Sequence, residues 1–262
     1  MWNRFLIVWV IFATLAGCAT GPVMQQNSEL SASAKRQQIN ALTDAQRYFL
    51  EIALRSEYGN ADPLVRRWER PVRLYIDGDR PTVLLAEADS VLNEIKQLAP
   101  HLDIAWVDQI KDANVKIFFG PYKEYSAKYA PSSRDRLRRN WGYFTVQWFT
   151  SGNGIESASM YVDTRRTRDD ETRRHLLREE LTQLFGLMAD SNRYPDSIFY
   201  QRWSTTTQYS DLDRQLIKML YDQRLHSGMD EQAIRAVWQA KAVGKEANAG
   251  DSQLQGLQLN WP

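Results

Sequence analysis

The chain has 262 residues and carries 33 Lys and Arg against 32 Asp and Glu, so its net charge is close to zero. This balance by itself indicates no particular partner, and the local basic cluster, from Arg134 to Arg139, is more typical of a solvated loop than of a nucleic-acid-binding stripe. Cys18 is the one cysteine, which excludes an internal disulfide bond and a metal site built from several thiolates. A domain without disulfides must be stabilised by its hydrophobic core, and this chain is long enough to form one.

The first residues have the pattern of a secretory signal. Arg4 provides a positive start, residues 5–16 are almost wholly apolar, and Leu15-Ala16-Gly17-Cys18 follows. The apolar run is too short to cross a bilayer, and its length is typical of the core of a signal peptide. Leu-Ala-Gly-Cys resembles a bacterial lipobox, in which the cysteine receives a diacylglycerol and becomes the first mature residue. A signal peptide with a chance cysteine and a short membrane anchor are the alternatives.

Ala19 follows the cysteine. By resemblance to Gram-negative lipoproteins, the absence of Asp at this position implies sorting to the outer membrane, with the domain on the periplasmic face. Several buried acyl chains would make this attachment effectively permanent. We therefore predict a signal peptide at 1–17, a lipidated Cys18 and flexible tether at 18–38, one domain at 39–242 and a polar tail at 243–262.

The domain shows a series of helix and strand patterns. Thr43 and Gln46 form a capping box, which predicts a helix that runs towards Glu57 and is stopped by Gly59. Another helix, opening at Pro81-Thr82, keeps its apolar positions at a 3.6-residue period. Apolar runs predict strands at 71–77, 102–107 and 115–119 and a hairpin formed by 141–149 and 157–162. Further helices are predicted around Glu179, at 211–225 and at 230–242, and a solvated loop at the basic cluster Arg134, Arg136, Arg138 and Arg139.

Glu179-Glu180-Leu181-Thr182-Gln183 is the most informative segment of the chain. It is similar to the metallopeptidase helix H-E-x-x-H, in which two histidines one turn apart bind zinc and the glutamate is the general base. Glu179 and Gln183 stand at the two histidine positions, and Glu180 stands at the position of the base. The resemblance implies a zincin scaffold whose metal-binding imidazoles have been replaced.

Two further features resemble the metzincin group of zincins. Gly186 is in register with the glycine of H-E-x-x-H-x-x-G-x-x-H, while the third-ligand position falls on Ala189 and Asp190 comes one residue late. Ser197-Ile198-Phe199 is similar to the tight turn that metzincins place under the metal, with the phenylalanine at the usual methionine. The resemblance implies an α+β, zincin-like fold with a mixed sheet, an edge strand that leads straight into the active-site helix, and a C-terminal helical subdomain.

A second resemblance covers about residues 45–242. Its marks are E-E-L-T-Q-x-x-G-L from Glu179, a Ser-Ile-Phe turn, and L-Y-D-x-R-L-x-x-G-M from Leu220 to Met229. They are similar to those of an uncharacterised bacterial family, a domain of unknown function found in secreted proteins and lipoproteins. This resemblance implies a family and no particular activity.

The spacing within the helix around Glu179 also predicts how its side chains are arranged. His175, Glu179 and Gln183 are spaced by four residues, so they form one polar stripe opposite a side covered by leucines. Glu180 points about 100° away from Glu179, among those leucines. One hypothesis makes Glu180 a general base that acts on water, and the other makes it a structural acid held by hydrogen bonds or by an arginine. The candidate arginines are Arg214 and Arg224.

The polar stripe is also a candidate site for a divalent metal. Glu179, Gln183 and Asp190 would form an oxygen-rich cluster, with His175 as an extra ligand. Oxygen donors suit Ca²⁺, Mg²⁺ or Mn²⁺ better than zinc, which favours imidazole and thiolate. A chain that binds no metal is the remaining alternative.

Two functions follow from these observations. The first is a degenerate metallopeptidase-like domain that acts as a binding or scaffolding module of the cell envelope, with an envelope protein, a peptide or a glycan as its partner. The second is a metal-dependent hydrolase, a peptidase with a non-standard Glu/Gln/Asp site and Glu180 as its general base. The aromatic residues Trp141, Trp148, Trp203 and Tyr209 either pack within the fold or line a groove for glycan or peptide.

Overall fold

The computed structural model describes residues 41–55 and 62–240, and the chain divides into the units Met1–Ala41 and Leu42–Pro262. All of the elements described below belong to the second unit. The predicted signal peptide, the lipidated Cys18, the tether and the polar tail lie outside the described residues. Within the described ranges, no helix combines the length and the apolar character needed to cross a membrane.

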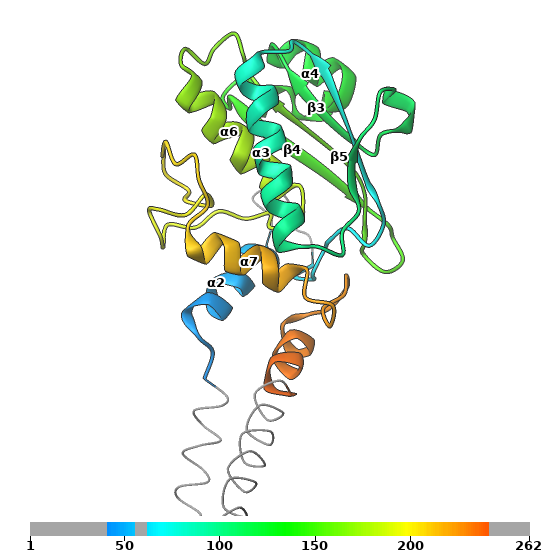
Figure 1. The fold of residues 1–262 in the computed structure, drawn as a ribbon, viewed down its shortest axis with the longest axis vertical. Helices are drawn as coiled ribbons and strands as arrows, with labels where there is room; N and C mark the ends of the chain where they lie inside the picture. Colours follow the sequence, from blue (N-terminus) through cyan, green and yellow to red (C-terminus); the bar gives the residue numbers. More distant parts are fainter. Residues whose placement is uncertain (1–40, 56–61, 241–262) are drawn as a thin grey trace, which may run out of the picture. The chain divides into compact units, whose positions relative to one another are not determined.

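A five-stranded sheet forms the centre of the domain (Figure 1). Its strands are β1 (Val72–Gly78), β2 (Ile104–Trp106), β3 (Val115–Phe119), β4 (Gly142–Trp148) and β5 (Ile155–Val162). They lie in the order β2-β1-β3-β5-β4. All neighbouring pairs are parallel except β4 and β5, which form an antiparallel hairpin. The predicted α+β class with a mixed sheet is therefore confirmed, and the strand predictions differ from the structure only at their ends.

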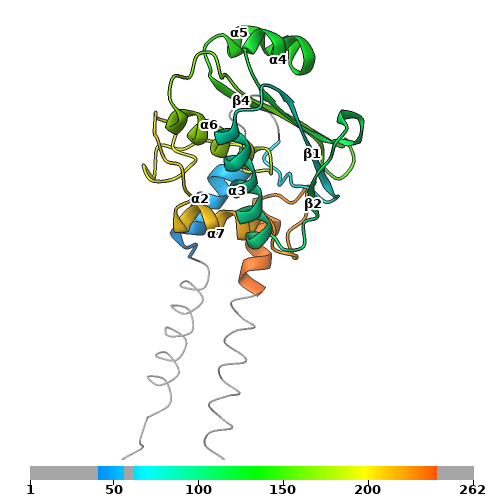
Figure 2. The same cartoon turned by 45° about the horizontal axis from the view of Figure 1, so that its top comes forward.

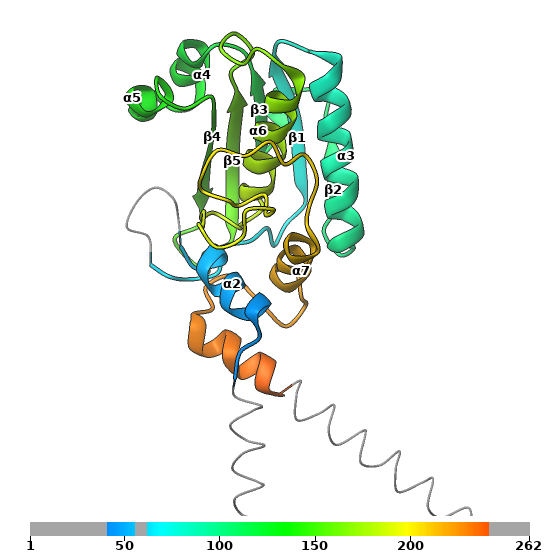
Figure 3. The same ribbon diagram turned by 90° about the vertical axis from the view of Figure 1, so that its left-hand side faces the viewer.

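Helices cover both faces of this sheet. The helices of the described residues are α2 (Asp44–Ala53), α3 (Thr82–Leu98), α4 (Tyr122–Tyr129), α5 (Arg134–Leu137), α6 (Asp170–Gln183), α7 (Asp211–Leu220) and a helix at 231–240, with short 3-10 turns at Ile110–Asp112 and Pro131–Ser133. Helices α3 and α6 pack side by side on one face, and α4 and α5 lie on the other (Figure 3).

The strand sequences explain this division, because successive side chains of a strand point to opposite faces of a sheet. On β3, Ile117 and Phe119 belong to the large core under α3 and α6, whereas Phe118 packs against α4 with Tyr125. On β5, Met160 faces the large core and Tyr161 faces the α4 side. The apolar strands are thus buried on both faces, as is usual for mostly parallel sheets.

The sequence resemblance misplaced the edge strand of this sheet. It implied that an edge strand leads straight into the active-site helix, which is α6. In the structure the edge strands are β2 and β4, and the strand that precedes α6 is β5, an internal strand between β3 and β4. The edge strand β4 packs against α6, although it does not directly precede that helix in the chain.

The helices α2 and α7 pack against each other at the end of the domain distant from α4 and α5 (Figure 2). Both begin with a capping box, at Thr43 for α2 as predicted and at Ser210 for α7. The helix at 231–240 joins them through an edge-to-face contact of Trp238 with Phe49, whose ring centroids are 5.8 Å apart. The predicted C-terminal helical part is thus present, together with the N-terminal α2.

Two helix predictions were wrong in extent, and part of a predicted loop is helical. Helix α2 ends at Ala53, short of the predicted Glu57, and the carbonyl of Ile52 accepts a hydrogen bond from the backbone of Ala189. Helix α7 ends at Leu220 and not at Leu225. At this end the Arg67 guanidinium donates a hydrogen bond to the Leu220 carbonyl oxygen at 2.7 Å. The basic cluster predicted to be a solvated loop begins with α5, because Leu137 is fully buried and fixes that turn against the sheet.

Candidate functional site

Helix α6 is fixed to the domain by its caps and its leucines. Asp169 caps the first turn by accepting a hydrogen bond from the backbone of Thr172 at 2.7 Å, and acidic residues follow it, as suits the positive end of a helix. Leu177 and Leu181 are fully buried in the large core. The polar side of the helix is thereby directed away from the sheet interior.

Beside this polar side lies a cavity of about 420 Å³, within the size range of small-ligand sites. Helix α6 contributes its floor, with Asp190 beyond the end of the helix. The wall is formed by 139–142, which leads into β4, and by 200–203, which follows the Ser-Ile-Phe turn. The side chains of α6 that line the cavity are His175, Leu176, Glu179, Glu180 and Gln183.

The structure brings all of the predicted candidates of this region together. Glu179, Gln183 and Asp190 line the same cavity, and the Gln183 amide donates a hydrogen bond to the Asp190 carboxylate at 2.6 Å. His175 Nε2 lies 3.5 Å from a Glu179 oxygen, one helical turn away. The predicted polar stripe is therefore present, and it faces the cavity.

His175 is buried, with 5% of its surface exposed. Its Nδ1 lies 2.7 Å from the carbonyl oxygen of Thr206, which fixes the ring so that Nε2 is directed to Glu179. Burial lowers the pKa of this imidazole below its ordinary value, and the Thr206 contact only partly opposes the shift. The neutral form is therefore favoured, and His175 adds no positive charge to the cavity near neutral pH.

The helical geometry predicted that Glu180 points among the leucines of α6. In the structure it also lines the cavity, with 8% of its surface exposed, and it lies under the first residue of β4. A Cβ atom added to Gly142 would lie 2.5 Å from Glu180 Oε1, so glycine is what allows the edge strand to approach this carboxylate. The close approach of strand and acid was not predicted, because it joins segments far apart in the sequence.

Both arginines proposed to hold Glu180 form ion pairs with other carboxylates in the structure. Arg214 binds Glu94 at 2.9 Å, and Arg224 binds Asp222 next to it in the chain. Both lie on α7 or in the loop that follows it, and α7 packs with α2 and α3. Glu180 itself forms contacts within the protein, and an arginine as its partner stays a prediction.

The donors around the cavity can be compared with the needs of a metal ion. A catalytic zinc site normally has three protein ligands drawn from imidazole, thiolate and carboxylate groups. Within residues 41–55 and 62–240, no three His, Cys, Asp or Glu side chains are close enough to hold a metal ion. The donor set therefore does not fit zinc, and the binding of another cation by Glu179, Gln183 and Asp190 stays a prediction.

Two tryptophans form the aromatic part of the wall. Trp141 and Trp203 are 38% and 63% exposed, and their rings meet edge to face with centroids 5.9 Å apart. Trp203 also contacts the His175 ring. The other two aromatic candidates lie elsewhere: Trp148 packs under Arg66, and Tyr209 is buried, with its hydroxyl 2.5 Å from that of Thr182.

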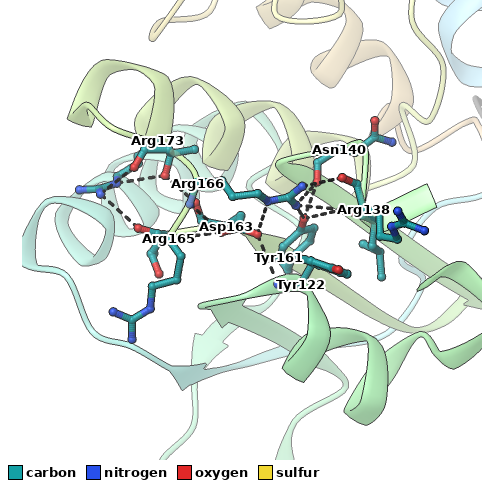
Figure 4. Close-up of polar contacts among 11 residues, drawn as sticks. Tyr122, Arg138, Asn140, Tyr161, Asp163, Arg165, Arg166 and Arg173 are labelled. Carbon is teal, nitrogen blue, oxygen red and sulfur yellow. Dashed lines mark hydrogen bonds and ion pairs between the residues drawn. The ribbon is translucent and has the colours of Figure 1, made fainter. Parts of the chain in front are cut away.

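A polar network holds the wall at 139–142 in place (Figure 4). The Arg166 guanidinium binds the Asp163 carboxylate at 2.6 Å and donates to the carbonyls of Leu137, Arg138 and Asn140 at 2.7–2.9 Å. The backbone of Asp163 donates to the Trp141 carbonyl at 2.7 Å. Sequence reasoning missed this network, because an Asp and an Arg three residues apart in a predicted loop have no distinctive pattern.

A second network fixes the Ser-Ile-Phe turn. Asp213 is fully buried and accepts hydrogen bonds from the Ser197 hydroxyl at 2.6 Å and from the backbone of Ile198 at 3.1 Å. The Ser197 hydroxyl also lies 2.9 Å from that of Tyr48, which connects the turn to α2. Burial raises the pKa of the Asp213 carboxyl, and its hydrogen bonds oppose that rise. The turn that precedes 200–203 is therefore rigidly placed.

Gly186 allows the sharp bend after α6 that the sequence had indicated. Its φ is +117°, a conformation that side chains rarely adopt, and a Cβ atom there would lie 2.0 Å from the carbonyl oxygen of Arg66. The bend returns the chain so that Asp190 reaches Gln183. Ala189, at the third-ligand position of the resemblance, is buried and carries no donor side chain.

Together these features define an α+β domain in which a central helix and an edge strand enclose a cavity with an acidic floor and an aromatic wall. The chain belongs to the family described as Protein of unknown function (DUF2927), whose family model matches residues 43–240. This confirms the predicted membership of an uncharacterised family, for which the sequence had indicated about residues 45–242. No curated protein matches the chain.

Proposed function

We propose that this chain is a binding module of the bacterial cell envelope, which holds a peptide in the cavity beside α6. Its domain is a degenerate zincin-like scaffold, and the lipidated Cys18 holds it at the outer membrane on the periplasmic face. The observation that carries the binding function is the cavity itself, in which the polar stripe of α6, the wall at 139–142 and the wall at 200–203 converge.

The edge strand favours a peptide over other ligands. β4 is paired with β5 on one side and is the last strand of the described sheet on the other. Residues 141 and 142, at the start of this strand, line the cavity. An extended peptide can add to the edge of a sheet through main-chain hydrogen bonds while a side chain enters an adjacent pocket. A glycan has no repeating main-chain donors and acceptors that match such an edge.

Three features support the zincin-like assignment. A strand, a helix and further strands precede α6, as the resemblance requires, and the edge strand packs against that helix. Gly186 makes the bend at the position that metzincins give to glycine. The Ser-Ile-Phe turn lies close to the cavity, since Tyr200 directly follows it and lines the wall. Fold resemblance alone does not carry an activity, and so the binding function rests on the cavity.

A second function, hydrolysis with Glu180 as general base, is favoured by one observation. Glu180 is largely buried and yet lines the cavity, which is the placement that a base acting on bound substrate needs. The donor set around it does not fit zinc, which is why we rank binding first. The two functions differ in what happens to the peptide, because a binding module returns it intact.

The test uses the purified full chain in detergent and a set of short, doubly capped fluorescent peptides. Saturable binding is measured by fluorescence anisotropy, the peptides are then analysed by mass spectrometry, and the metal content is determined by elemental analysis. The proposal expects saturable binding, intact peptides and no stoichiometric metal. Cleaved peptides that stay intact with Glu180→Gln would support the hydrolase instead, and no binding by any peptide would contradict both.

A further inference from the structure

The charged groups on the floor of the cavity are engaged within the protein. Glu179 lies 3.5 Å from the His175 ring, and the Asp190 carboxylate accepts a hydrogen bond from Gln183. Glu180 also forms contacts within the protein. A ligand that bound to these carboxylates would compete with the protein's own groups, so the groups that select a ligand by charge are expected on the wall.

The wall of the cavity carries two guanidinium groups, those of Arg139 and Arg202. Arg139 lies in the turn that leads into β4, and Arg202 lies in the segment that follows the Ser-Ile-Phe turn. Both residues are exposed, and no carboxylate of the described residues forms an ion pair with either side chain. The two wall segments thus contribute positive charges that a ligand can bind without displacing a partner.

The outer edge of β4 begins beside these arginines. Gly142 is the first residue of β4 and lines the cavity, and the described sheet has no strand beyond β4 (Figure 3). The backbone of Asp163 donates to the Trp141 carbonyl, so these two residues, which continue the β4–β5 register, form a hydrogen-bonded pair. Because bonded and outward-facing residues alternate along an antiparallel strand, the backbone groups of Gly142 and Phe144 face the outer edge. An extended peptide can therefore pair with β4 from the rim of the cavity onwards.

The direction of β4 decides which end of such a peptide reaches the arginines. β4 pairs antiparallel with β5, and antiparallel pairs are both more common and slightly more stable per residue than parallel ones. A peptide that adds antiparallel to β4 places its C-terminal end at the start of that strand, next to Arg139 and Arg202. A guanidinium can bind a carboxylate through two parallel hydrogen bonds, so a free C-terminus matches this position. A parallel peptide would instead bring its positive amino terminus there, which two guanidinium groups would repel.

The aromatic side chains of the wall suit an apolar residue at the end of the peptide. Among the described residues, four large hydrophobic side chains are exposed, and two of them, Trp141 and Trp203, lie at this cavity. An apolar side chain that packs against these rings removes their exposed surface from water. The wall thus offers charge for a carboxylate and apolar surface for the side chain beside it.

We infer that the cavity receives the C-terminal residue of a peptide, whose free carboxylate is bound by Arg139 and Arg202 and whose apolar side chain packs against Trp141 and Trp203. The rest of the peptide pairs antiparallel with the outer edge of β4. This inference rests on the proposed peptide-binding function and adds its substrate class, which is peptides with a free C-terminus. Strand direction and wall charge lead to the same end of the peptide independently.

The experiment compares three fluorescent peptides that are blocked at the N-terminus and share one apolar sequence. The first ends in a free carboxylate, and the second ends in a carboxamide. The third also ends in a carboxamide but carries a glutamate near its blocked end, so it has the net charge of the first without the terminal carboxylate. Binding to the full chain in detergent is measured by anisotropy and by calorimetry. We expect the free acid to bind at least about tenfold more tightly than either carboxamide, because the carboxamides lose the charge-assisted hydrogen bonds and keep the main-chain contacts with β4.

Variants then locate the contact. Arg139→Gln and Arg202→Gln should each weaken the free acid by about threefold or more, and the double variant should bind the free acid and the carboxamide equally within about twofold. None of these changes should alter the affinity for the carboxamide by more than about twofold. Arg168→Gln, the same change at an exposed arginine that does not line the cavity, is the matched control and should leave all three peptides unaffected. Trp203→Ala should weaken the free acid and the carboxamide alike, because both keep the apolar side chain.

The outcomes separate the inference from the function on which it rests. If no peptide binds saturably, the proposed function fails and the inference fails with it. If the peptides bind but the free acid equals the carboxamide, or if the glutamate gives the same gain in affinity, the proposed function stands and the site for the C-terminus is wrong. A preference for the free acid that persists in the double variant would also overturn the inference, because other groups would then bind the carboxylate. The comparison of the three peptides uses the unaltered chain, so it remains decisive even if a variant fails to fold.

Discussion

Replacement of Gly142 by alanine is the sharpest test of how the edge strand and α6 form the site. The new Cβ atom would lie 2.5 Å from Glu180 Oε1, 3.1 Å from its Cγ and 3.2 Å from its Cδ. Gly142 is not among the residues with positive φ, so alanine adds no backbone strain, and the effect is a local collision. The Glu180 carboxylate must move, or the strand must retreat from the helix.

The magnitude follows from overpacking. An extra methyl group in a well-packed site costs about 1–3 kcal/mol, which corresponds to a fall in Tm of roughly 2–12 °C for a domain of this size. Gly154→Ala is the matched control on the same hairpin. Its Cβ would meet Glu69 Cγ at 3.6 Å, an ordinary contact, and so its stability should stay within about 0.5 kcal/mol of wild type.

Thermal unfolding followed by circular dichroism measures the stability of both variants, and fluorescence anisotropy measures their binding of the capped peptide that the wild type binds most tightly. A double variant, Gly142→Ala with Glu180→Ala, removes the colliding carboxylate and should recover part of the lost stability, with a coupling of about 0.5–3 kcal/mol. Equal melting and equal binding of Gly142→Ala and Gly154→Ala would refute the contact between the edge strand and Glu180.

Three further predictions concern other parts of the chain. Arg166→Leu leaves the buried carboxylate of Asp163 without its cation, and we expect it to lower the free energy of unfolding, measured by chemical denaturation, by about 3–5 kcal/mol. Arg165 is the exposed neighbour, and Arg165→Leu should lower it by less than about 1 kcal/mol. Equal losses would contradict the network behind the wall. Cys18→Ala should abolish labelling with radioactive palmitate and release the protein from membranes, and equal labelling of the variant would exclude lipidation at Cys18. Burial raises the pKa of the Asp213 carboxyl in the folded chain, so folding favours its protonated form. As the pH falls through that pKa, the free energy of unfolding of the wild type should therefore increase relative to that of Asp213→Asn. A difference between the two proteins that stays constant across the acid range would contradict the raised pKa.

Local patterns in the sequence were sufficient to predict most of the fold. The capping box at Thr43, the 3.6-residue period of α3 and the largely apolar sequence of β3 each act over a few residues, and each appears in the structure. The ends of helices were less predictable, since distant groups terminate them. The Arg67 side chain donates a hydrogen bond to the Leu220 carbonyl at the end of α7, and no pattern within that helix indicates this partner.

The candidate site was predictable to the extent that it lies on one helix. His175, Glu179 and Gln183 share the face of α6 that lines the cavity, as their spacing indicated. The opposite wall was not predictable, because Gly142 and Trp203 reach the helix through the sheet and through the turn held by Asp213. Long-range placement of this kind leaves no periodic signal in the chain.

The central claim, that a peptide occupies the cavity beside α6, is tested most directly by hydrogen–deuterium exchange of the full chain with and without a saturating concentration of the capped peptide that it binds most tightly. The account predicts new protection concentrated in 139–142, 175–183 and 200–203, together with the start of β4, and little change in α2 and α7. Protection confined to other segments, or none despite saturated binding, would show that the ligand binds elsewhere and would contradict the account.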